Sequence, residues 1–194
     1  MRKVIVTTLM SLDGYVCGPE GNFMVMPLDE SFSAYNAERL RTADTLLLGA
    51  TTYAGFKEYW PPVADDETQP PVEREISRLN GAMEKVVVSD SLGDDDTGAW
   101  ADTTRIVKRA DTHDVVRELR AGDGGDILMF GSVTLWNDLL AHGLVDELHL
   151  MVGNASIGDG LPAFTGGSER LGLVEVRRLD GSQNVLLRYA VPTS

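Results

Sequence analysis

Residues 126–140 read DILMFGSVTLWNDLL, an apolar run that breaks at a Gly-Ser pair before a helical pattern begins. The apolar residues 135, 136, 139 and 140 recur at the spacing that places side chains on one helix face. Ser132 is a good N-cap, and Gly131 has no side chain to obstruct a ligand that approaches the backbone. A buried strand that leads into the free amides of a helix start can hold a phosphate. This stretch therefore predicts a nucleotide cofactor, with a simple helix-capping turn as the alternative.

Outward from this stretch, strand and helix patterns alternate along the chain. Strands are expected at 3–10, 45–48, 85–88, 104–107, 126–130 and 144–152, the last with one wetter face. Helical patterns lie between them, around 32–40, 52–56, 72–79, 115–119 and 135–140, and a proline-rich surface loop is expected at 60–71. Two final extended runs, 171–179 and 183–191, flank the hairpin signal Asp180-Gly181. The order predicts one α/β domain with a mostly parallel sheet and an antiparallel edge.

Composition narrows the classes of partner. The 194 residues carry a formal net charge of −13, which argues against nucleic acid and against anionic membrane surfaces. Cys17 is the only cysteine, so the chain can form neither an internal disulfide nor a thiolate metal cluster. No apolar run approaches the length of a membrane span, and the N-terminal stretch reads as a strand rather than a signal peptide. We therefore expect a cytoplasmic protein.

Three of the expected strands end in a similar way. The ends are LGATT at 48–52, VSDS at 88–91 and FGSVT at 130–134, each with small or hydroxyl residues where a buried strand stops. Ligands of α/β sheets collect at the carboxyl ends of strands. Together the three ends are suited to bonding phosphate and ribose oxygens; the alternative is that they are only caps and turns.

Several blocks, in order and correctly spaced, resemble a known family. They are SLDG at 11–14, YNAERL at 35–40, ADTLLLG at 43–49 ahead of Thr52-Tyr53, and GLVDEL at 143–148. The chain resembles the dihydrofolate-reductase-like proteins, in the branch related to the C-terminal reductase domain of riboflavin biosynthesis, from about residue 3 to residue 190. The resemblance implies a single domain over 1–192 with a three-layer α-β-α fold, a mostly parallel central sheet and an antiparallel C-terminal hairpin. It also implies NADPH as cofactor, a small conjugated substrate and a homodimer.

The resemblance also assigns site residues by position. The residues that would border the adenosine-side phosphates are Gly49, Thr51 and Thr52, and Ser89 would touch the adenine ribose. The backbone amides that would hold the pyrophosphate belong to Gly131, Ser132, Val133 and Thr134. Asp13 and Tyr35 would face the nicotinamide and the substrate as catalytic residues. For Asp13, stabilisation of its own turn is the alternative.

The chain departs from the family pattern at positions that bear on specificity. Relatives commonly carry arginine where this chain has Ala50, and they often carry arginine or another residue that favours a 2′-phosphate where it has Asp90. Asp90 would repel a 2′-phosphate, whereas a carboxylate suits a ribose 2′-hydroxyl. NADPH and NADH therefore both stay open. Phe130 stands where riboflavin-pathway reductases usually carry glutamate, which counts against their pyrimidine substrate. The acid that protonates folate in dihydrofolate reductases has no secure match on the first helix, which counts against folate reduction. A non-catalytic dinucleotide-binding or sensor protein is the rival interpretation.

The remaining polar candidates are weaker. His113, His142 and His149 lie on different expected elements, so we expect no metal site. Asp146 and Glu147 suit a structural or interfacial role as well as a catalytic one.

Overall fold

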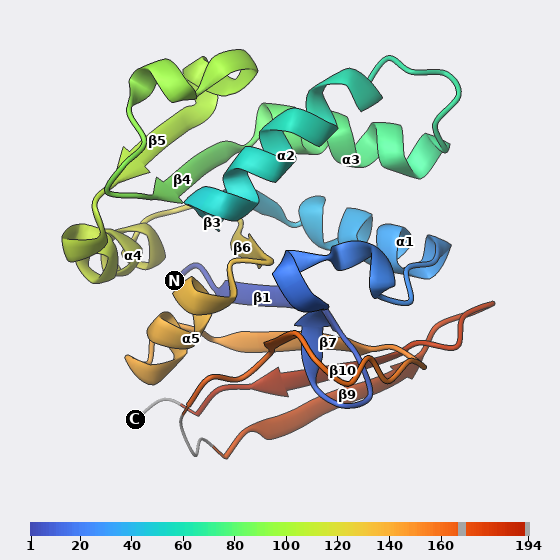
Figure 1. The fold of residues 1–194 in the computed structure, drawn as a ribbon. Helices are drawn as coiled ribbons and strands as arrows, with labels where there is room; N and C mark the ends of the chain where they lie inside the picture. Colours follow the sequence, from blue (N-terminus) through green and yellow to red (C-terminus); the bar gives the residue numbers. More distant parts are fainter. Residues whose placement is uncertain (167–169, 193–194) are drawn as a thin grey trace. The chain divides into compact units, whose positions relative to one another are not determined.

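A computed structural model describes residues 1–166 and 170–192. The chain divides into two compact units, one of Met1–Val4 with Ser33–Ser132 and one of Ile5–Phe32 with Val133–Ser194. Figure 1 colours the chain from blue at the N-terminus to red at the C-terminus. The expectation of one domain over 1–192 stays a prediction.

The first unit is built on parallel strands. Its strand order is β5-β4-β3-β6, with β3 at Ala43–Gly49, β4 at Glu84–Val88, β5 at Thr104–Val107 and β6 at Asp126–Phe130. All three pairings are parallel, as expected from strands that read as continuous apolar runs. Residues 46–48, 86–87 and 127–129 are 0% exposed, so these strands form the core of the unit.

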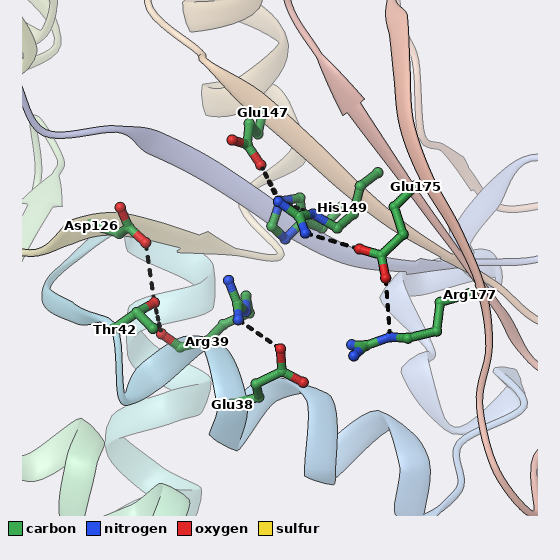
Figure 2. Close-up of polar contacts among 9 residues, drawn as sticks. Glu38, Arg39, Thr42, Asp126, Glu147, His149, Glu175 and Arg177 are labelled. Carbon is green, nitrogen blue, oxygen red and sulfur yellow. Dashed lines mark hydrogen bonds and ion pairs between the residues drawn. The ribbon is translucent and has the colours of Figure 1, made fainter.

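Helices connect these strands. They are α1 at Glu30–Leu40, whose first three residues fall in the second unit, α2 at Ala50–Val63, α3 at Pro71–Ala82 and α4 at Thr112–Ala121. Short 3-10 turns lie at Asp94–Asp96, Gly98–Thr103 and Arg109–Asp111. Figure 1 shows α2 and α3 running side by side. The hydroxyl oxygen of Thr42 lies 2.9 Å from the Arg39 carbonyl and 3.1 Å from an Asp126 carboxylate oxygen, linking the end of α1 to the start of β6 (Figure 2).

The expected loop at 60–71 is only partly a loop. Helix α2 continues through Pro61 and Pro62 to Val63, and the loop covers only the residues before α3. Each proline lacks the N–H that would donate to the carbonyl four residues earlier, so the last turn of α2 is short of two helical hydrogen bonds. The ring of Trp60 lies 6.1 Å from Phe56, and the Trp60 carbonyl accepts a hydrogen bond of 2.6 Å from the Ser77 hydroxyl on α3. Packing between α2 and α3 therefore stabilises a turn that the proline pair alone predicted as irregular.

The second unit combines parallel and antiparallel strands. Its order is β1-β7-β10-β9, with β1 at Val4–Met10, β7 at Glu147–Val152, β9 at Gly172–Arg178 and β10 at Val185–Ala190. Strands β1 and β7 are parallel, while β10 is antiparallel to both β7 and β9, which confirms the C-terminal hairpin. A two-stranded sheet pairs β2 (Tyr15–Cys17) with β8 (Leu161–Pro162), α5 covers Val133–Ala141, and 3-10 turns lie at Pro19–Gly21 and Phe23–Val25.

Strand β7 differs from its expected burial. One wetter face was predicted from its alternating polar and apolar residues, but Glu147 is 8% exposed and His149 is 0% exposed. Both polar side chains have partners on neighbouring strands, as described below, so burial does not leave them unsatisfied. The prediction of a wetter face is wrong for this strand.

Asp29 fixes the start of α1. Its carboxylate accepts hydrogen bonds of 3.1 Å from the backbone N–H groups of Ser31 and Phe32, which makes it an N-cap. It also accepts from the Ser182 hydroxyl and, at 3.1 Å, from the Asn184 amide, both in the hairpin loop. Burial acts to raise the pKa of Asp29, but these hydrogen bonds outweigh it and hold the pKa below its ordinary value.

Among the residues described, no helix combines the length and apolar character needed to cross a lipid bilayer.

Candidate functional site

The carboxyl ends of the parallel strands in the first unit line up along one edge of the sheet. Gly49 at the end of β3 pairs with Val88 of β4, and Val88 pairs with Val107 of β5. Strand β6 runs parallel to β3 and leads into the Gly131–Ser132 turn. Three of the predicted strand ends therefore lie along one edge, as the sequence analysis requires.

The Gly131–Ser132 turn is held in an unusual conformation. Both residues have positive φ, 53° for Gly131 and 48° for Ser132, and for serine this region is disfavoured. The Ser132 N–H donates to the Thr52 hydroxyl at 3.0 Å, and the Ser132 hydroxyl accepts from the Gly49 N–H at 3.0 Å. Backbone strain of this kind concentrates at functional sites because the surroundings must enforce it. Here the surroundings are the end of β3 and the first turn of α2.

Gly131 has a steric reason to be glycine. A Cβ added there would lie 3.0 Å from the Thr52 Oγ1 and 3.2 Å from its methyl carbon, and the φ of 53° adds strain for any larger residue. Gly131 is itself exposed, so its backbone is open to a ligand. These observations fit a cradle for a phosphate group.

The start of α2 supplies further donors. Gly49 is its N-cap residue, with no side chain to occupy the free amides of the first turn. Thr51 is exposed and Thr52 is half-buried against the Gly131 turn. A helix start without a capping side chain retains free N–H groups for an anion. Thr52 instead acts through the turn that it holds.

The structure gives both polar groups of Ser132 other partners than predicted. The amide was expected to bind pyrophosphate and the hydroxyl to cap the start of α5. Instead, the amide donates to the Thr52 hydroxyl, and the hydroxyl accepts from the Gly49 N–H. Ser132 therefore shapes the turn. Val133 and Thr134, the first two residues of α5, follow it directly in the chain; Val133 is buried and Thr134 is exposed. Their amides, in the first turn of a helix, have no partner within the helix.

Ser89 and Asp90 follow the end of β4. The Ser89 hydroxyl accepts from the backbone N–H groups of Ser91 at 3.2 Å and Leu92 at 3.0 Å, so it organises its own turn, and the residue is 2% exposed. Asp90 is exposed and contacts Arg109 and Lys108, which follow β5. The structure thus brings two cations to a strand end where the sequence indicated only a carboxylate.

Asp13 organises a loop of the second unit. Its carboxylate accepts hydrogen bonds from the hydroxyls of Ser11 at 2.6 Å and Ser156 at 2.8 Å, and from the Gly158 N–H at 2.7 Å. The bonds from Ser11 and Gly158 hold the pKa of Asp13 well below its usual range. A carboxylate held ionised cannot donate a proton at neutral pH. The geometry favours the alternative that Asp13 stabilises its turn.

Tyr35, the other predicted catalytic residue, lies on α1 and is 3% exposed. The guanidinium carbon of Arg39, one helical turn later, lies 5.6 Å from the centre of its ring. This contact places a cation over an aromatic face. A catalytic role for Tyr35 stays a prediction.

A charged network, which sequence reasoning did not predict, crosses three strands of the second unit, buried at His149 and Glu147 and half-buried at its other end (Figure 2). His149 Nε2 lies 2.8 Å from Glu147 Oε2 and 3.3 Å from Arg188 Nε. Arg188 also donates to Glu147 at 3.0 Å and to Glu175 at 2.9 Å. One ring nitrogen can donate to Glu147 or accept from Arg188, and the shorter contact favours donation to Glu147.

The network has a structural explanation. The register pairs His149 with Arg188 and Arg188 with Glu175, so the Arg188 guanidinium lies between Glu147 on β7 and Glu175 on β9. Opposite charges on directly facing residues stabilise antiparallel pairs. The hairpin signal at Asp180-Gly181 was the one sequence cue from which this pairing could have been predicted.

Comparisons with known proteins identify a family for the chain. A family model described as the RibD C-terminal domain matches residues 2–185. An uncharacterised protein of Bacillus subtilis (strain 168), YyaP, is 27% identical over 187 residues, which cover 95% of this chain and 92% of that protein.

Solved structures share the fold. A putative riboflavin biosynthesis protein from Shewanella sp. PV-4 aligns with a TM-score of 0.70 and 20% identity over 98% of this chain and 99% of that one. A pyrimidine reductase-like protein from Corynebacterium diphtheriae gives 0.65 and 16% over 100% and 93%. The diaminohydroxyphosphoribosylaminopyrimidine deaminase/5-amino-6-(5-phosphoribosylamino)uracil reductase of Thermotoga maritima gives 0.67 and 14%, over 98% of this chain and 57% of that one.

The expected fold class is confirmed: a mostly parallel central sheet with helices around it and an antiparallel C-terminal hairpin. With the family model spanning nearly the whole sequence and the Gly131 turn on the expected sheet edge, this chain belongs to the RibD C-terminal domain family, and its fold is dihydrofolate-reductase-like.

Proposed function

We propose that this chain is a nicotinamide-dinucleotide-dependent reductase that transfers hydride to a small conjugated substrate. Its family is named for the reductase domain of RibD, and the solved relatives include proteins named as pyrimidine or uracil reductases. This family relationship supports NADPH as the coenzyme class. The true substrate, pteridine-like, pyrimidine-like or other, is left to experiment.

The observation that carries this proposal is the Gly131–Ser132 turn. Gly131 and Ser132 both have positive φ, and Ser132 is held by hydrogen bonds to Thr52 and Gly49, which leaves Gly131 exposed beside the uncapped start of α2. Backbone N–H groups can bind a diphosphate without a large positive surface. This matters because the chain carries a net charge of −13, and its surface as a whole would repel an anionic coenzyme.

The protein's contribution would be binding and alignment. The bound nicotinamide would supply the hydride. Gly131 and the free amides in the first turn of α2 would offer backbone donors to the diphosphate, and Thr52 and Ser132 would hold the turn in shape. Fixing the coenzyme in this way turns an encounter of two molecules into a reaction between positioned groups.

Titration and turnover measurements test the proposal. Calorimetry with NADPH and with NADH should show saturable binding of at least one. Coenzyme oxidation should then appear with some member of a panel of pteridines, pyrimidines and other conjugated carbonyl compounds. No binding of either coenzyme by the folded protein would refute the proposal.

A second candidate, a non-catalytic dinucleotide-binding or sensor protein, is favoured by one observation. Asp13 is held ionised by hydrogen bonds, so this predicted catalytic residue does not suit proton donation. Tight coenzyme binding without oxidation across the panel would support this candidate. Turnover that persists in Asp13→Asn would support the reductase and show that the proton comes from another group or from water.

We also propose a homodimer, for which β9 provides the support. This strand is last in the order of the described strands of its unit, and Leu173, Val174 and Val176 on it are 55–60% exposed. A second copy paired antiparallel about Val176 would place Glu175 of each copy opposite Arg177 of the other. Opposite charges on facing residues favour such a pairing, and exposed strand edges otherwise invite aggregation.

A further inference from the structure

An exposed side of α2 carries a groove, called here the α2 groove, with a volume of about 440 Å³. Its lining residues belong to α2 from Gly55 onward and to the loop that leads to α3. The apolar part of the lining comes from Gly55, Tyr59, Pro62 and Val63. Sites for small molecules have volumes of about 300–1,000 Å³ and mostly apolar linings. The α2 groove therefore has the size and the lining of a small-molecule site.

Gly55 leaves the α2 groove open. It lies inside α2, where glycine weakens a helix relative to alanine. No atom of the described residues lies within 4 Å of a Cβ added there, so packing does not require the missing side chain. A larger residue at this position would extend into the groove. An open groove accounts for a helix glycine that packing does not explain.

Tyr59 gives the groove an aromatic wall. The residue is 50% exposed, and its ring centre lies 4.8 Å from that of Trp60 in an edge-to-face contact that fixes its orientation. Partial burial raises the pKa of the Tyr59 phenol, and the charge of Glu73 adds to this effect. The phenol therefore keeps its proton at neutral pH. A neutral aromatic ring attracts cations to its face.

The polar part of the lining is acidic. It consists of Glu58, Asp66 and Gln69, so none of the lining residues is a cation. The Asp66 carboxylate accepts from the Thr68 hydroxyl at 2.6 Å and from the Thr68 N–H at 2.9 Å. These bonds hold the pKa of Asp66 below its ordinary value, so the group is ionised at neutral pH. Lys57, next to Glu58 in the chain, donates instead to a backbone carbonyl of a 3-10 turn.

The loop beside the groove adds further negative charge. Asp65 and Glu67 flank Asp66 and are both exposed. Two cations of α3 act on the same loop: Arg78 donates at 2.9 Å to a carbonyl that follows α2, and the charge of Arg74 contributes to the lowered pKa of Asp66. The four carboxylates of the groove and its loop outnumber these two arginines. The α2 groove therefore complements a cation that has an apolar body.

We propose that the α2 groove binds a small organic amine. The apolar body of the amine lies against Tyr59, and its ammonium pairs with the carboxylates of Glu58 and Asp66. Hydrogen bonds between ionised groups are stronger than neutral ones, so the ammonium sets the specificity. The site is separate from the proposed coenzyme site: at a rise of 1.5 Å per residue, Tyr59 lies about 14 Å along α2 from its first residue, Ala50.

Two ligands of the same shape provide the test. Phenethylamine carries an ammonium at pH 7 where phenethyl alcohol carries a hydroxyl. In an NMR titration of the whole protein, followed at the backbone amides of Gly55 and Tyr59, the amine should bind at least about tenfold more tightly, the effect of one charged hydrogen bond. In the double variant Glu58→Gln with Asp66→Asn, this advantage should fall about tenfold or more, with binding of the alcohol nearly unchanged.

The matched control for charge is Asp65→Asn with Glu67→Gln, which removes the same charge from the loop but none from the lining. It should leave the advantage of the amine nearly intact. An equal loss in the two double variants would overturn the inference, because the field of the loop, not contact in the groove, would then attract the amine. Equal binding of amine and alcohol by the native protein, or binding of neither, would overturn it as well.

A second pair of variants tests the groove itself. Gly55→Leu fills it and should abolish binding of both ligands. Gly81→Leu makes the same change in α3, where an added Cβ likewise meets no described atom within 4 Å, and should leave both affinities as they were. Leucine favours a helix over glycine, so neither variant should lower the free energy of unfolding. Unchanged binding in Gly55→Leu would contradict the site.

Two further titrations fix the source of the ammonium and the place of binding. Nα-acetyl-lysine amide presents an ammonium as a partner protein would. If it binds more tightly than phenethylamine, the groove takes a lysine side chain of a partner, and the small-molecule assignment falls. Saturation with NADPH should leave the affinity for phenethylamine unchanged. Displacement of the amine by the coenzyme would place both in one site and would overturn the inference.

Discussion

At the scale of single residues, Thr52 connects the start of α2 to the strained turn before α5. Its hydroxyl accepts the Ser132 N–H, and its side chain fills the space that a Cβ on Gly131 would need. A buried or half-buried N–H that loses its acceptor costs about 1–3 kcal/mol. Thr52 is therefore expected to control the shape of the turn without touching the coenzyme through its hydroxyl.

Thr52→Val removes the acceptor while nearly preserving the side-chain shape. We expect coenzyme affinity to fall about fivefold or more, which corresponds to about 1 kcal/mol. Thr52→Ser retains the hydroxyl and should stay within about twofold of the native affinity. Calorimetric titration of both variants checks this, and equal affinities for valine and serine at this position would contradict the role.

Lys85 is a buried amine whose partners are all uncharged. The residue is 0% exposed; its ammonium donates to the carbonyls of Gly81 at 3.1 Å and Met83 at 2.7 Å, and lies 4.6 Å from the centre of the Trp100 ring. Burial lowers its pKa to about 8. An unfolded lysine has a pKa of about 10.4.

Stability should therefore rise with pH between about 8 and 10.4, where the unfolded chain binds the extra proton. The slope contributed by one group is at most about 1.4 kcal/mol per pH unit. Lys85→Met lacks this contribution. Urea unfolding of both proteins from pH 7 to pH 10 measures the difference, and parallel stability curves would show that Lys85 keeps its proton throughout.

At the scale of elements, Asp29 ties the start of α1 to the loop between β9 and β10. The same carboxylate caps two backbone amides of the helix and accepts from Ser182 and Asn184. Ser182 and Asn184 are 5% and 1% exposed, so loss of this acceptor strands buried donors.

Asp29→Ala should lower the free energy of unfolding by about 2–4 kcal/mol, the sum of a lost N-cap and of unsatisfied buried donors. Asp123→Ala, an exposed aspartate, is the control and should change stability by less than about 0.5 kcal/mol. Denaturant unfolding at pH 7 gives both values. Because the pKa of Asp29 is lowered, its contribution is present above its unfolded pKa of about 3.9 and disappears as pH falls below that value.

At the scale of the whole molecule, the proposed dimer depends on β9. Val176→Lys would place two ammonium groups face to face at the centre of the proposed pairing. We expect the mass measured by light scattering to fall from that of two chains to that of one, 21.1 kDa. Ala101→Lys adds the same charge at an exposed position on the other unit and should leave the mass unchanged. A monomeric native protein would contradict the dimer.

Local patterns were sufficient to predict the order of the elements. Apolar runs such as 45–48 and 85–88 have few alternatives to a buried strand, and the four-residue spacing at 135–140 specifies a helix. The glycine-serine step at 131–132 marked the strand-to-helix turn because glycine adopts positive φ readily. These are the features that the sequence by itself determined.

Tertiary structure decided which distant residues share a hydrogen bond. Thr52 and Ser132 are 80 positions apart, and Asp90 and Arg109 are 19 apart. Likewise, the Trp60 carbonyl in the proline-bearing turn accepts its hydrogen bond from Ser77 of α3, 17 positions later. Such contacts depend on strand register and helix packing, which sum many weak interactions along the chain. The sequence therefore indicated candidate strand ends, while the register between β4 and β5 brought Arg109 beside Asp90.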